Sequence, residues 1–298
     1  MPISLNEVPC RIVATARELL PGTLRRWSIH RSIVRFDVAG QLDPTFGTNG
    51  IARLDLSTGA VAGTAFRGDT SWGLTLLRED DLLIIGGKLA DGTGRTDIDY
   101  AVVKLTSHGA VDTTLGTDGH LTLDLEQGGD SPRTAIVQPD GKIVVSGHTR
   151  GTNDVVTTVL FRLLSNGQFD PSFGKNGVVN VALFASVAEA YDVALQGQTL
   201  VIAGYGWEVS PGTVDIISAR FLPDGTWDTT YGEKGVAVID VAGQDVRSRT
   251  LQILPDQRVL IVGQGKPTAT TQNGALILLT PMASAIQDLM AMASRLSI

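Results

Sequence analysis

The chain has 298 residues, of which 43% are hydrophobic, 18% are charged and 34 are glycine. Its 31 acidic residues outnumber 24 basic ones, and no run of Lys or Arg offsets the formal net charge of −7, so the composition argues against a nucleic-acid partner. The single cysteine excludes an internal disulfide bond and a thiolate cluster for zinc.

The N-terminal stretch 1–20 carries charged side chains and lacks the apolar core of a conventional signal peptide. No apolar run in the chain approaches the length of a membrane span. We therefore expect a protein without a membrane span that is either cytoplasmic or exported by an unconventional route.

A nine-residue motif occurs four times. The copies are LDPTFGTNG (42–50), VDTTLGTDG (111–119), FDPSFGKNG (169–177) and WDTTYGEKG (227–235). A recurrence every 58 to 69 residues is typical of stacked or radial repeats rather than of independent domains.

Two apolar segments recur with the same period. The first is a β-branched run that ends in glycine, with copies at 80–87, 140–147, 198–204 and 257–263 and a diverged copy at 11–16. The second leads into the motif and occurs at 32–41, 100–110, 158–168 and 217–226, with a final copy at 274–281. Two further strands, such as 121–125 and 131–138, separate the motif from the next glycine-ended run.

Four strands per period predict an all-β fold, a β-propeller of about five blade positions with eighteen strands and one incomplete blade. We expect a single domain over 1–280, with repeats near 11–50, 51–119, 120–177, 178–235 and 236–280. Apolar residues at helical spacing, with Thr280 as the N-cap and Pro281 at the first helical position, predict a short C-terminal helix over 281–298.

The combination of LDPTFGTNG (42–50), DYAVVKLTSHG (99–109) and QPDGKIVVSG (138–147) resembles the delta-60 repeat family of bacterial β-propeller-like proteins. The resemblance covers roughly residues 11–280. It implies a repeat β-propeller of the kind usually found in bacterial extracellular or surface proteins, without a common catalytic centre.

The repeats also distinguish two faces of the predicted propeller. The motif and the turn at 138–141 are nearly constant between repeats, whereas the loops at the other strand ends diverge, and diverging loops on a fixed scaffold commonly carry binding function. Exposed aromatic and charged side chains suit recognition of a glycan or a protein. The candidate ligand-binding residues on this variable face are Arg25, Arg26, Trp27, Arg67, Asp69, Arg95, Asp97, Tyr205, Trp207 and Glu208. The alternative is that they only pack long loops onto the rim.

Three carboxylates suggest a metal site. Asp55, Asp124 and Asp240 each stand five residues after the closing glycine of a motif, and Ala182 takes this place in the third repeat. If the strand after the motif is innermost, the carboxylates converge near the axis and could hold calcium. The alternative is that they bond nearby backbone in turns.

A basic residue precedes the motif aspartate by eight positions in every copy. The pairs are Arg35 with Asp43, Lys104 with Asp112, Arg162 with Asp170, and Arg220 with Asp228. Repetition in every blade indicates structural ion pairs.

No catalytic motif stands out, since the four histidines lack metal-ligand spacing and no GxSxG sequence occurs. The leading prediction is therefore a non-catalytic module, without a required cofactor, that binds a glycan or protein partner. One alternative is a propeller hydrolase or lactonase-type enzyme with carboxylates near the axis. Another is a module of a larger bacterial toxin or adhesin assembly, in which a second copy or chain completes the half blade.

Overall fold

The protein is all-β in the computed structural model, and no α-helix occurs among the described residues. The chain forms two compact units, Met1–Asp124 and Leu125–Ile298, which are described separately below. Of the predicted helix over 281–298, residues 284–298 lie outside the described residues, and the expected start is wrong because 281–283 form a turn in which Ala283 has a φ of 69°. The structure describes residues 11–14, 31–57, 60–62, 65–77, 80–92, 94–125, 128–151, 154–207, 213–241, 243, 245–268 and 271–283.

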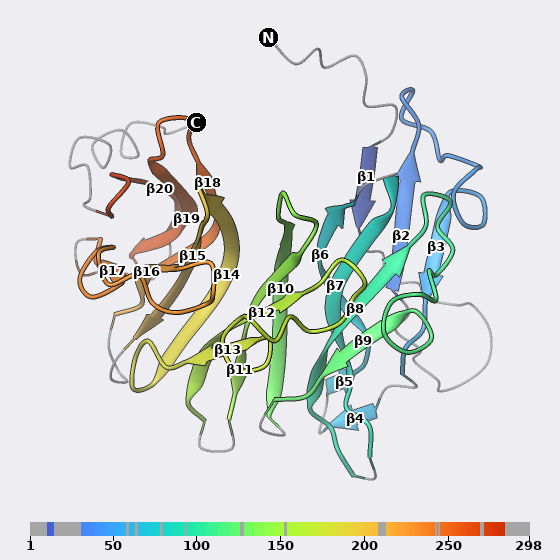
Figure 1. Cartoon of the computed structure of the whole chain (residues 1–298), viewed down its shortest axis with the longest axis horizontal. Helices are drawn as coiled ribbons and strands as arrows, with labels where there is room; N and C mark the ends of the chain where they lie inside the picture. Colours follow the sequence, from blue (N-terminus) through green and yellow to red (C-terminus); the bar gives the residue numbers. More distant parts are fainter. Residues whose placement is uncertain are drawn as a thin grey trace. The chain divides into compact units, whose positions relative to one another are not determined.

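Unit 1 contains two antiparallel sheets and a separate hairpin. The sheets are β1 (Arg11–Ala14), β2 (Arg31–Phe36) and β3 (Ile51–Leu54), and then β6 (Thr70–Leu76), β7 (Leu82–Leu89), β8 (Ile98–Leu105) and β9 (His120–Leu123) (Figure 1). The hairpin consists of β4 (Ala60–Ala62) and β5 (Ala65–Arg67), which pair antiparallel with each other.

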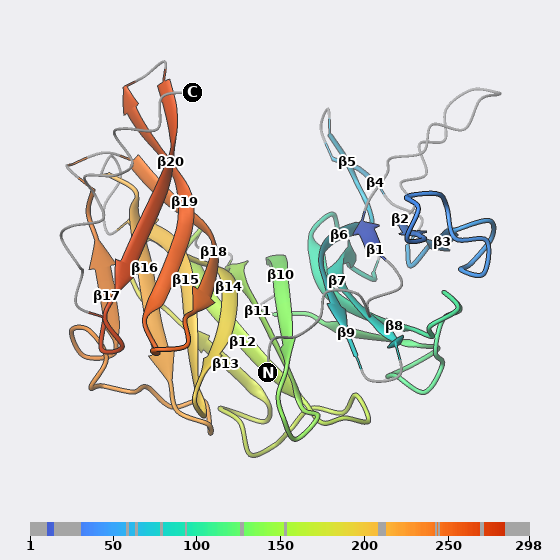
Figure 2. The ribbon, with the colours of Figure 1, turned by 90° about the horizontal axis from the view of Figure 1, so that it is seen from above.

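Unit 2 repeats the same sheet order. Its strands are β10 (Gly129–Val137), β11 (Ile143–Arg150), β12 (Val156–Leu163) and β13 (Val178–Val181); β14 (Val187–Gln196), β15 (Thr199–Trp207), β16 (Asp215–Phe221) and β17 (Val236–Ile239); and β18 (Asp245–Ile253), β19 (Val259–Thr268) and β20 (Thr271–Leu279). One parallel bridge, Val156 to Val187, joins the first two groups. The first strands β10, β14 and β18 contact one another in sequence, as Figure 2 shows from above.

The repeated motif folds back, so that the strand after it pairs with the strand before it. In the third copy, Phe161 of β12 pairs with Val178 of β13. Gly174 has a φ of 53°, and a Cβ atom there would come within 2.4 Å of the Val178 carbonyl oxygen, so this turn requires glycine. The strand after the motif is therefore the last strand of its sheet, which corrects the premise that it is innermost.

Within each unit, the motif also joins one sheet to the next along the chain. Arg162 Nε contacts Asp170 Oδ2 at 2.8 Å, as predicted for the ion pair, while Nη1 donates to the Pro223 carbonyl of the following sheet. In the same turn, Gly174 N donates to Asp224 O at 2.7 Å. We call this combination of an arginine and a glycine amide, both held on the next turn, the latch.

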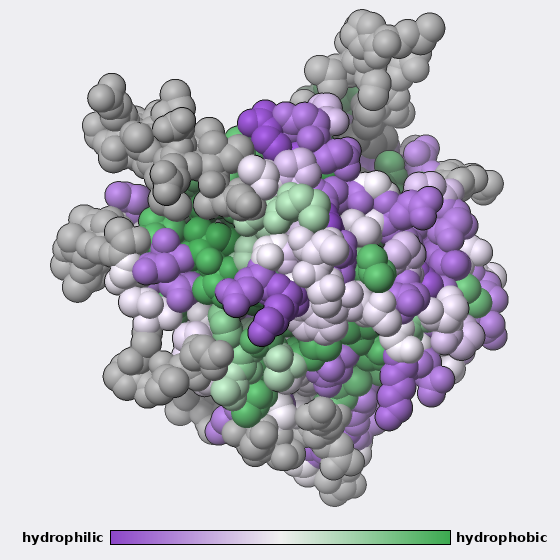
Figure 3. Space-filling model, turned by 60° about the vertical axis from the view of Figure 1, so that its left-hand side comes forward, coloured by the Kyte–Doolittle hydropathy of each residue, from purple (hydrophilic) through white to green (hydrophobic). Residues whose placement is uncertain are grey.

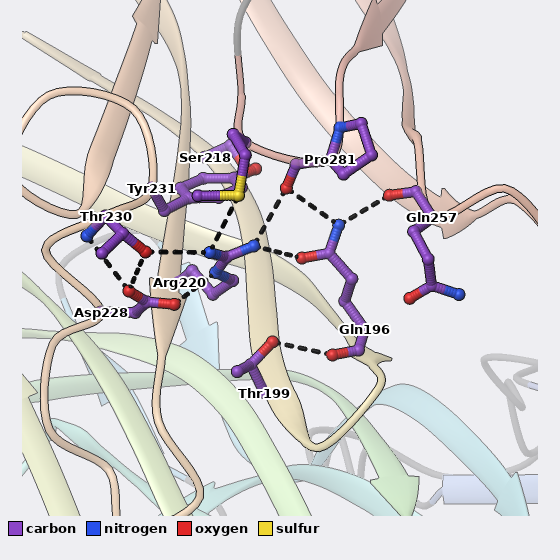
Figure 4. A network of polar contacts seen from close by, with 10 residues as sticks. Gln196, Thr199, Ser218, Arg220, Asp228, Thr230, Tyr231, Gln257 and Pro281 are labelled. Atoms are coloured by element: carbon purple, nitrogen blue, oxygen red, sulfur yellow. Dashed lines mark hydrogen bonds and ion pairs between the residues drawn. The ribbon is translucent and has the colours of Figure 1, made fainter.

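The latch recurs around Arg35 and Arg220. Arg35 donates to Ser107 O, and Arg220 Nη1 donates to Pro281 O at 2.9 Å. Figure 4 shows that Arg220 also reaches Asp228, Thr230 and Gln196. The prediction of structural ion pairs is confirmed, and their second role is to connect consecutive repeats.

The middle strands β7, β11 and β15 are buried along nearly their whole length, because both faces of each are covered.

Apolar side chains are not confined to the interior. Figure 3 shows a band of them reaching one face of the molecule between hydrophilic margins, and exposed apolar residues of unit 2 include Val238 of β17 and Leu276 of β20.

Candidate functional site

The same irregularity recurs in four first strands. β6, β10, β14 and β18 each contain a register shift that leaves one residue without a partner on the neighbouring strand. A β-bulge of this kind bends the strand and re-aims the extra side chain. The four bulge residues are Trp72, Arg133, Tyr191 and Arg249.

In unit 2, the bulge residues meet around Tyr191. Arg133 Nη2 donates to Tyr191 Oη at 3.2 Å, and its guanidinium carbon lies 4.4 Å from the centre of the tyrosine ring. Arg249 approaches the same ring at 5.0 Å, and Tyr205 Oη lies 3.2 Å from Tyr191 Oη. Arg247 in turn stands 5.1 Å from the ring of Tyr205. Two phenols are thus surrounded by three guanidinium groups.

His148 and Glu189 complete this group. His148, which is 6% exposed, stacks beside Tyr191 with ring centres 6.3 Å apart, and its Nε2 lies 3.5 Å from Glu189 Oε2. Glu189 is also 3.9 Å from Arg133. We call these seven residues the bulge cluster: Arg133, His148, Glu189, Tyr191, Tyr205, Arg247 and Arg249.

The charges of the bulge cluster favour an anionic ligand. Burial, together with the nearby positive charge of Arg133, lowers the pKa of His148 to about 3, so the imidazole is neutral at pH 7. Burial also raises the pKa of Tyr205, with help from the Tyr191 hydroxyl and the charge of Glu189, so its phenol stays protonated. Three arginines therefore face a single carboxylate, and the cluster carries excess positive charge. The side chains of Arg133 and Glu189 are only 11% and 13% exposed, whereas Arg249 is exposed, so Arg249 is the arginine of the cluster most accessible to a ligand.

Unit 1 contains a second, acidic group, which we call the acid cluster: Arg95, Asp97, Asp99 and Asp124. Arg95 Nη1 contacts Asp124 Oδ2 at 2.6 Å, Nε contacts Asp97 Oδ1 at 3.0 Å, and Nη2 lies 3.4 Å from Asp99 Oδ1. Burial and the neighbouring Asp124 raise the pKa of Asp99 to about 6, and the carboxylates likewise raise the pKa of Arg95.

Carboxylate oxygens of the three aspartates lie within 4.8 Å of one another, close enough to ligate a cation. The guanidinium of Arg95 already occupies the middle of this group and supplies its positive charge. The cluster unites Arg95 and Asp97, predicted as ligand-binding residues, with Asp124, predicted as a metal ligand. It also adds Asp99, which the sequence analysis did not single out.

The other predicted carboxylates have local roles. Asp69 is 1% exposed and accepts from Leu56 N and Ser57 Oγ, both at 2.6 Å, so it holds a turn rather than facing a ligand. Asp240 accepts from Gly243 N at 2.7 Å, the turn role given as the alternative. Asp55, like Asp124 and Asp240, follows the last strand of its sheet, so the reason for expecting these three to converge at an axis is absent.

Of the aromatic residues predicted to bind a ligand, Tyr205 belongs to the bulge cluster, and Trp207 is half-buried at the end of β15. The side chain of Arg67 lies outside the described part of the structure, as do Arg25, Arg26, Trp27 and Glu208.

Sequence reasoning missed most of the bulge cluster. A usable signal exists, because Arg133, Tyr191 and Arg249 each precede a Thr or Asp at the same place in the repeat. When a large residue changes its chemistry between otherwise similar strands, the position is typically not constrained by the packing of the repeat. Without the register shift, these residues appear as ordinary members of a strand.

Comparisons with known proteins support the fold. A profile for a β-propeller domain of unknown function, DUF5122, matches residues 138–173. The sequence finds no match among curated proteins. The chain is therefore β-propeller-like, while the finer assignment to delta-60 repeats is not tested by this partial match.

Several solved structures share the fold at low sequence identity. An ulvan lyase of polysaccharide lyase family PL25, bound to -[GlcA(1-4)Rha3S]-, has a TM-score of 0.53 and 10% identity over 95% of this chain and 70% of that chain. A second structure of a PL25 ulvan lyase has a TM-score of 0.53 and 12% identity over 94% and 68%. The α-L-arabinanase of Penicillium chrysogenum has a TM-score of 0.49 and 11% identity over 74% of this chain. This chain spans 65% of the arabinanase.

These comparisons correct the leading functional prediction. The sequence analysis favours a non-catalytic binding module, whereas the solved structures that share the fold at a TM-score of 0.53 are polysaccharide lyases. The prediction gave weight to the absence of a catalytic motif, and such an absence is weak evidence because a propeller can assemble a site from side chains on separate blades. Among the described residues, no helix is long and apolar enough to cross a membrane.

Proposed function

We propose that this protein is a glycan-cleaving enzyme that acts on an acidic polysaccharide at the bulge cluster by β-elimination. The observation that carries the proposal is the convergence of three arginines, two tyrosines and a neutral histidine on the first strands and their neighbours in unit 2. The fold shared with lyases, one of them bound to a glucuronate-containing chain, supports the same class of reaction.

The residues divide between binding and proton transfer. A uronate carboxylate binds the guanidinium groups, because bidentate arginine contacts suit carboxylates. Neutralising this carboxylate makes the adjacent C5–H more acidic. His148 accepts the C5 proton, and Glu189 at 3.5 Å stabilises the imidazolium that forms. The C4–O4 bond then breaks with its electron pair on O4, a C4=C5 double bond forms, and Tyr191 donates its proton to O4.

Substrate binding also changes the base. The positive charge of Arg133 is one cause of the low pKa of His148. A carboxylate bound to Arg133 offsets that charge, so the histidine becomes more basic only when a substrate is present. The Tyr205 hydroxyl, 3.2 Å from Tyr191 Oη, can donate a hydrogen bond to the phenolate that Tyr191 becomes after cleavage.

The test is cleavage of a panel of uronate polysaccharides, followed by ultraviolet absorbance of the unsaturated product. Removing the hydroxyl with Tyr191→Phe should lower kcat by roughly 10²-fold or more, the usual range for loss of a general acid. Arg258→Lys, at an exposed pair with Asp256, is the control and should leave the rate unchanged. Absence of unsaturated product from every substrate, or a Y191F rate within about threefold of the original, would refute the proposal.

A second candidate is a glycoside hydrolase that uses the acid cluster. It is favoured by one observation, the pKa of about 6 at Asp99, which lets this carboxyl donate a proton beside Asp97 and Asp124. Hydrolysis would release new reducing ends without unsaturated product, and Asp99→Asn would abolish it while Tyr191→Phe would not.

We also propose that the sheets are five blade positions of delta-60 repeats. The order of strands, repeated from β6 onward, supports this arrangement. A three-stranded sheet at each end of the series accounts for the incomplete blades. A glycan remains the partner that the proposed chemistry requires.

A further inference from the structure

Trp72 is the bulge residue of β6 and is 59% exposed. Its neighbours Ser71 and Gly73 pair with Gly86 and Ile85 of β7, so the register shift falls at the tryptophan itself. Burial of a large aromatic side chain stabilises a protein, and an indole left this exposed forgoes much of that gain. The side chain of Trp72 is therefore accessible to a ligand.

The place of Trp72 in the repeat points to ligand contact. The same bulge in the three corresponding strands carries Arg133, Tyr191 and Arg249, all members of the bulge cluster. The backbone feature is constant while the side chain changes from indole to guanidinium to phenol. That combination is typical of a position that meets a ligand with different chemistry in each repeat.

The chemistry around Trp72 selects an uncharged sugar. The pairs Thr70–Gly87 and Lys88–Asp99 place the start of β6 and the acid cluster at the same end of this sheet. Three aspartates against one arginine make that end negative, which disfavours a uronate. Their carboxylate oxygens are acceptors for sugar hydroxyls, and the flat indole suits the C–H face of a sugar ring.

We propose that Trp72 is a stacking platform for an uncharged sugar residue of the glycan. This inference rests on the proposed function for its ligand class, and it concerns a residue of unit 1, whereas the bulge cluster belongs to unit 2. It accounts for the exposure of the indole, for the bulge that projects it and for the acidic surroundings at that end of the sheet.

The test is calorimetric titration of the full chain with cellohexaose, xylohexaose and arabinohexaose. Trp72→Ala should weaken binding of the preferred hexasaccharide at least tenfold, and Trp72→Phe, which keeps a smaller ring, about threefold. The control is Leu76→Ala, because Leu76 is similarly exposed on the same strand but lies outside the bulge. Binding unchanged by Trp72→Ala, or absent with all three sugars, would overturn the inference.

The variant Tyr191→Phe separates this inference from the proposed function. If Trp72 is the platform, Y191F binds the hexasaccharide as the original chain does, whether or not uronate polysaccharides are cleaved. A loss of hexasaccharide binding in Y191F with full binding in W72A would place the sugar at the bulge cluster and overturn the role of Trp72. Failure of uronate cleavage with Trp72-dependent binding intact would overturn only the proposed reaction.

Discussion

The latch at Arg162 should be a main support of unit 2, and replacement of this arginine by lysine tests it. The side chain of Arg162 is almost fully buried and has four partners. It contacts Asp170 at 2.8 Å and Ser172 Oγ at 3.1 Å, donates to Pro223 O, and lies 4.6 Å from the centre of the Phe173 ring. Lysine keeps the charge, but its single ammonium cannot reach all of these groups.

The size of the effect follows from the hydrogen bonds that lysine cannot make. Hydrogen bonds from a charged donor contribute about 1.5–3 kcal/mol each, and Arg162→Lys forfeits those to Ser172 and Pro223 while keeping the pair with Asp170. Since Lys142 also lies 3.4 Å from Asp170, this carboxylate is not left isolated. We expect unfolding to be easier by about 3 kcal/mol, a fall in Tm of roughly 6–12 °C for a unit of this size.

Urea unfolding followed by circular dichroism measures this change directly. Arg150→Lys is the matched control, because Arg150 is half exposed and pairs with the exposed Asp154, so its effect on stability should stay within about 0.5 kcal/mol. If R162K and R150K unfold at the same urea concentration, the latch does not stabilise the unit and the reasoning fails.

Three further predictions concern burial and backbone geometry. The folded pKa of His148 is about 3 and the unfolded value is about 6.5, so between these pH values the unfolded chain binds one proton more than the folded chain. Stability should therefore fall as the pH drops through that window, by up to about 1.4 kcal/mol per pH unit. Urea unfolding at pH 7 and 5 should show a smaller fall in His148→Gln, and equal falls would contradict the burial of a neutral imidazole. Asp99 should affect the pH dependence of stability in the opposite direction, because its folded pKa of about 6 exceeds the ordinary 3.8 and its contribution to stability falls as the pH rises. Asp99→Asn should therefore stabilise the fold more at pH 7.5 than at pH 4.5 in thermal melts. A pH-independent effect would contradict the raised pKa of Asp99. Gly225→Ala should lower the free energy of unfolding by about 2–4 kcal/mol, because Gly225 has a φ of 84° and a Cβ would come within 3.0 Å of Gly174 N. The control Gly274→Ala, with open space around the glycine, should leave the urea unfolding midpoint nearly unchanged. Equal effects of the two substitutions would contradict the close approach at Gly225.

The repeat made much of the fold predictable from sequence. The motif at 169–177 and the glycine-ended run at 140–147 indicate strands and turns because they combine apolar β-branched residues with glycines at fixed places. The ion pair of Arg162 with Asp170 follows from a constant spacing of eight. The spacing does not predict that the strand after the motif pairs with the strand before it, because this pairing depends on the direction in which the chain reverses at the motif.

The candidate site was less predictable for a physical reason. Tyr191 and Arg133 are 58 residues apart in the chain and meet only because adjacent first strands lie side by side. Loop residues such as Trp207 attracted attention because diverging loops often bind ligands, while the bulge residues stand inside strands. Asp99 was overlooked because its pKa depends on burial and on Asp124, neither of which appears in the local sequence.

The latch has a consequence for synthesis of the chain. Its donor always belongs to the earlier repeat and its acceptor to the later one, and Arg162 and Pro223 are separated by 61 residues. After a repeat has left the ribosome, about one more repeat must therefore be synthesised before its arginine can donate to the carbonyl. At roughly 5–20 residues per second, that interval is about 3–12 seconds. During this time, the newest sheet has its strands but not its connection, so within each unit a repeat with a latch is secured only after its successor has been synthesised.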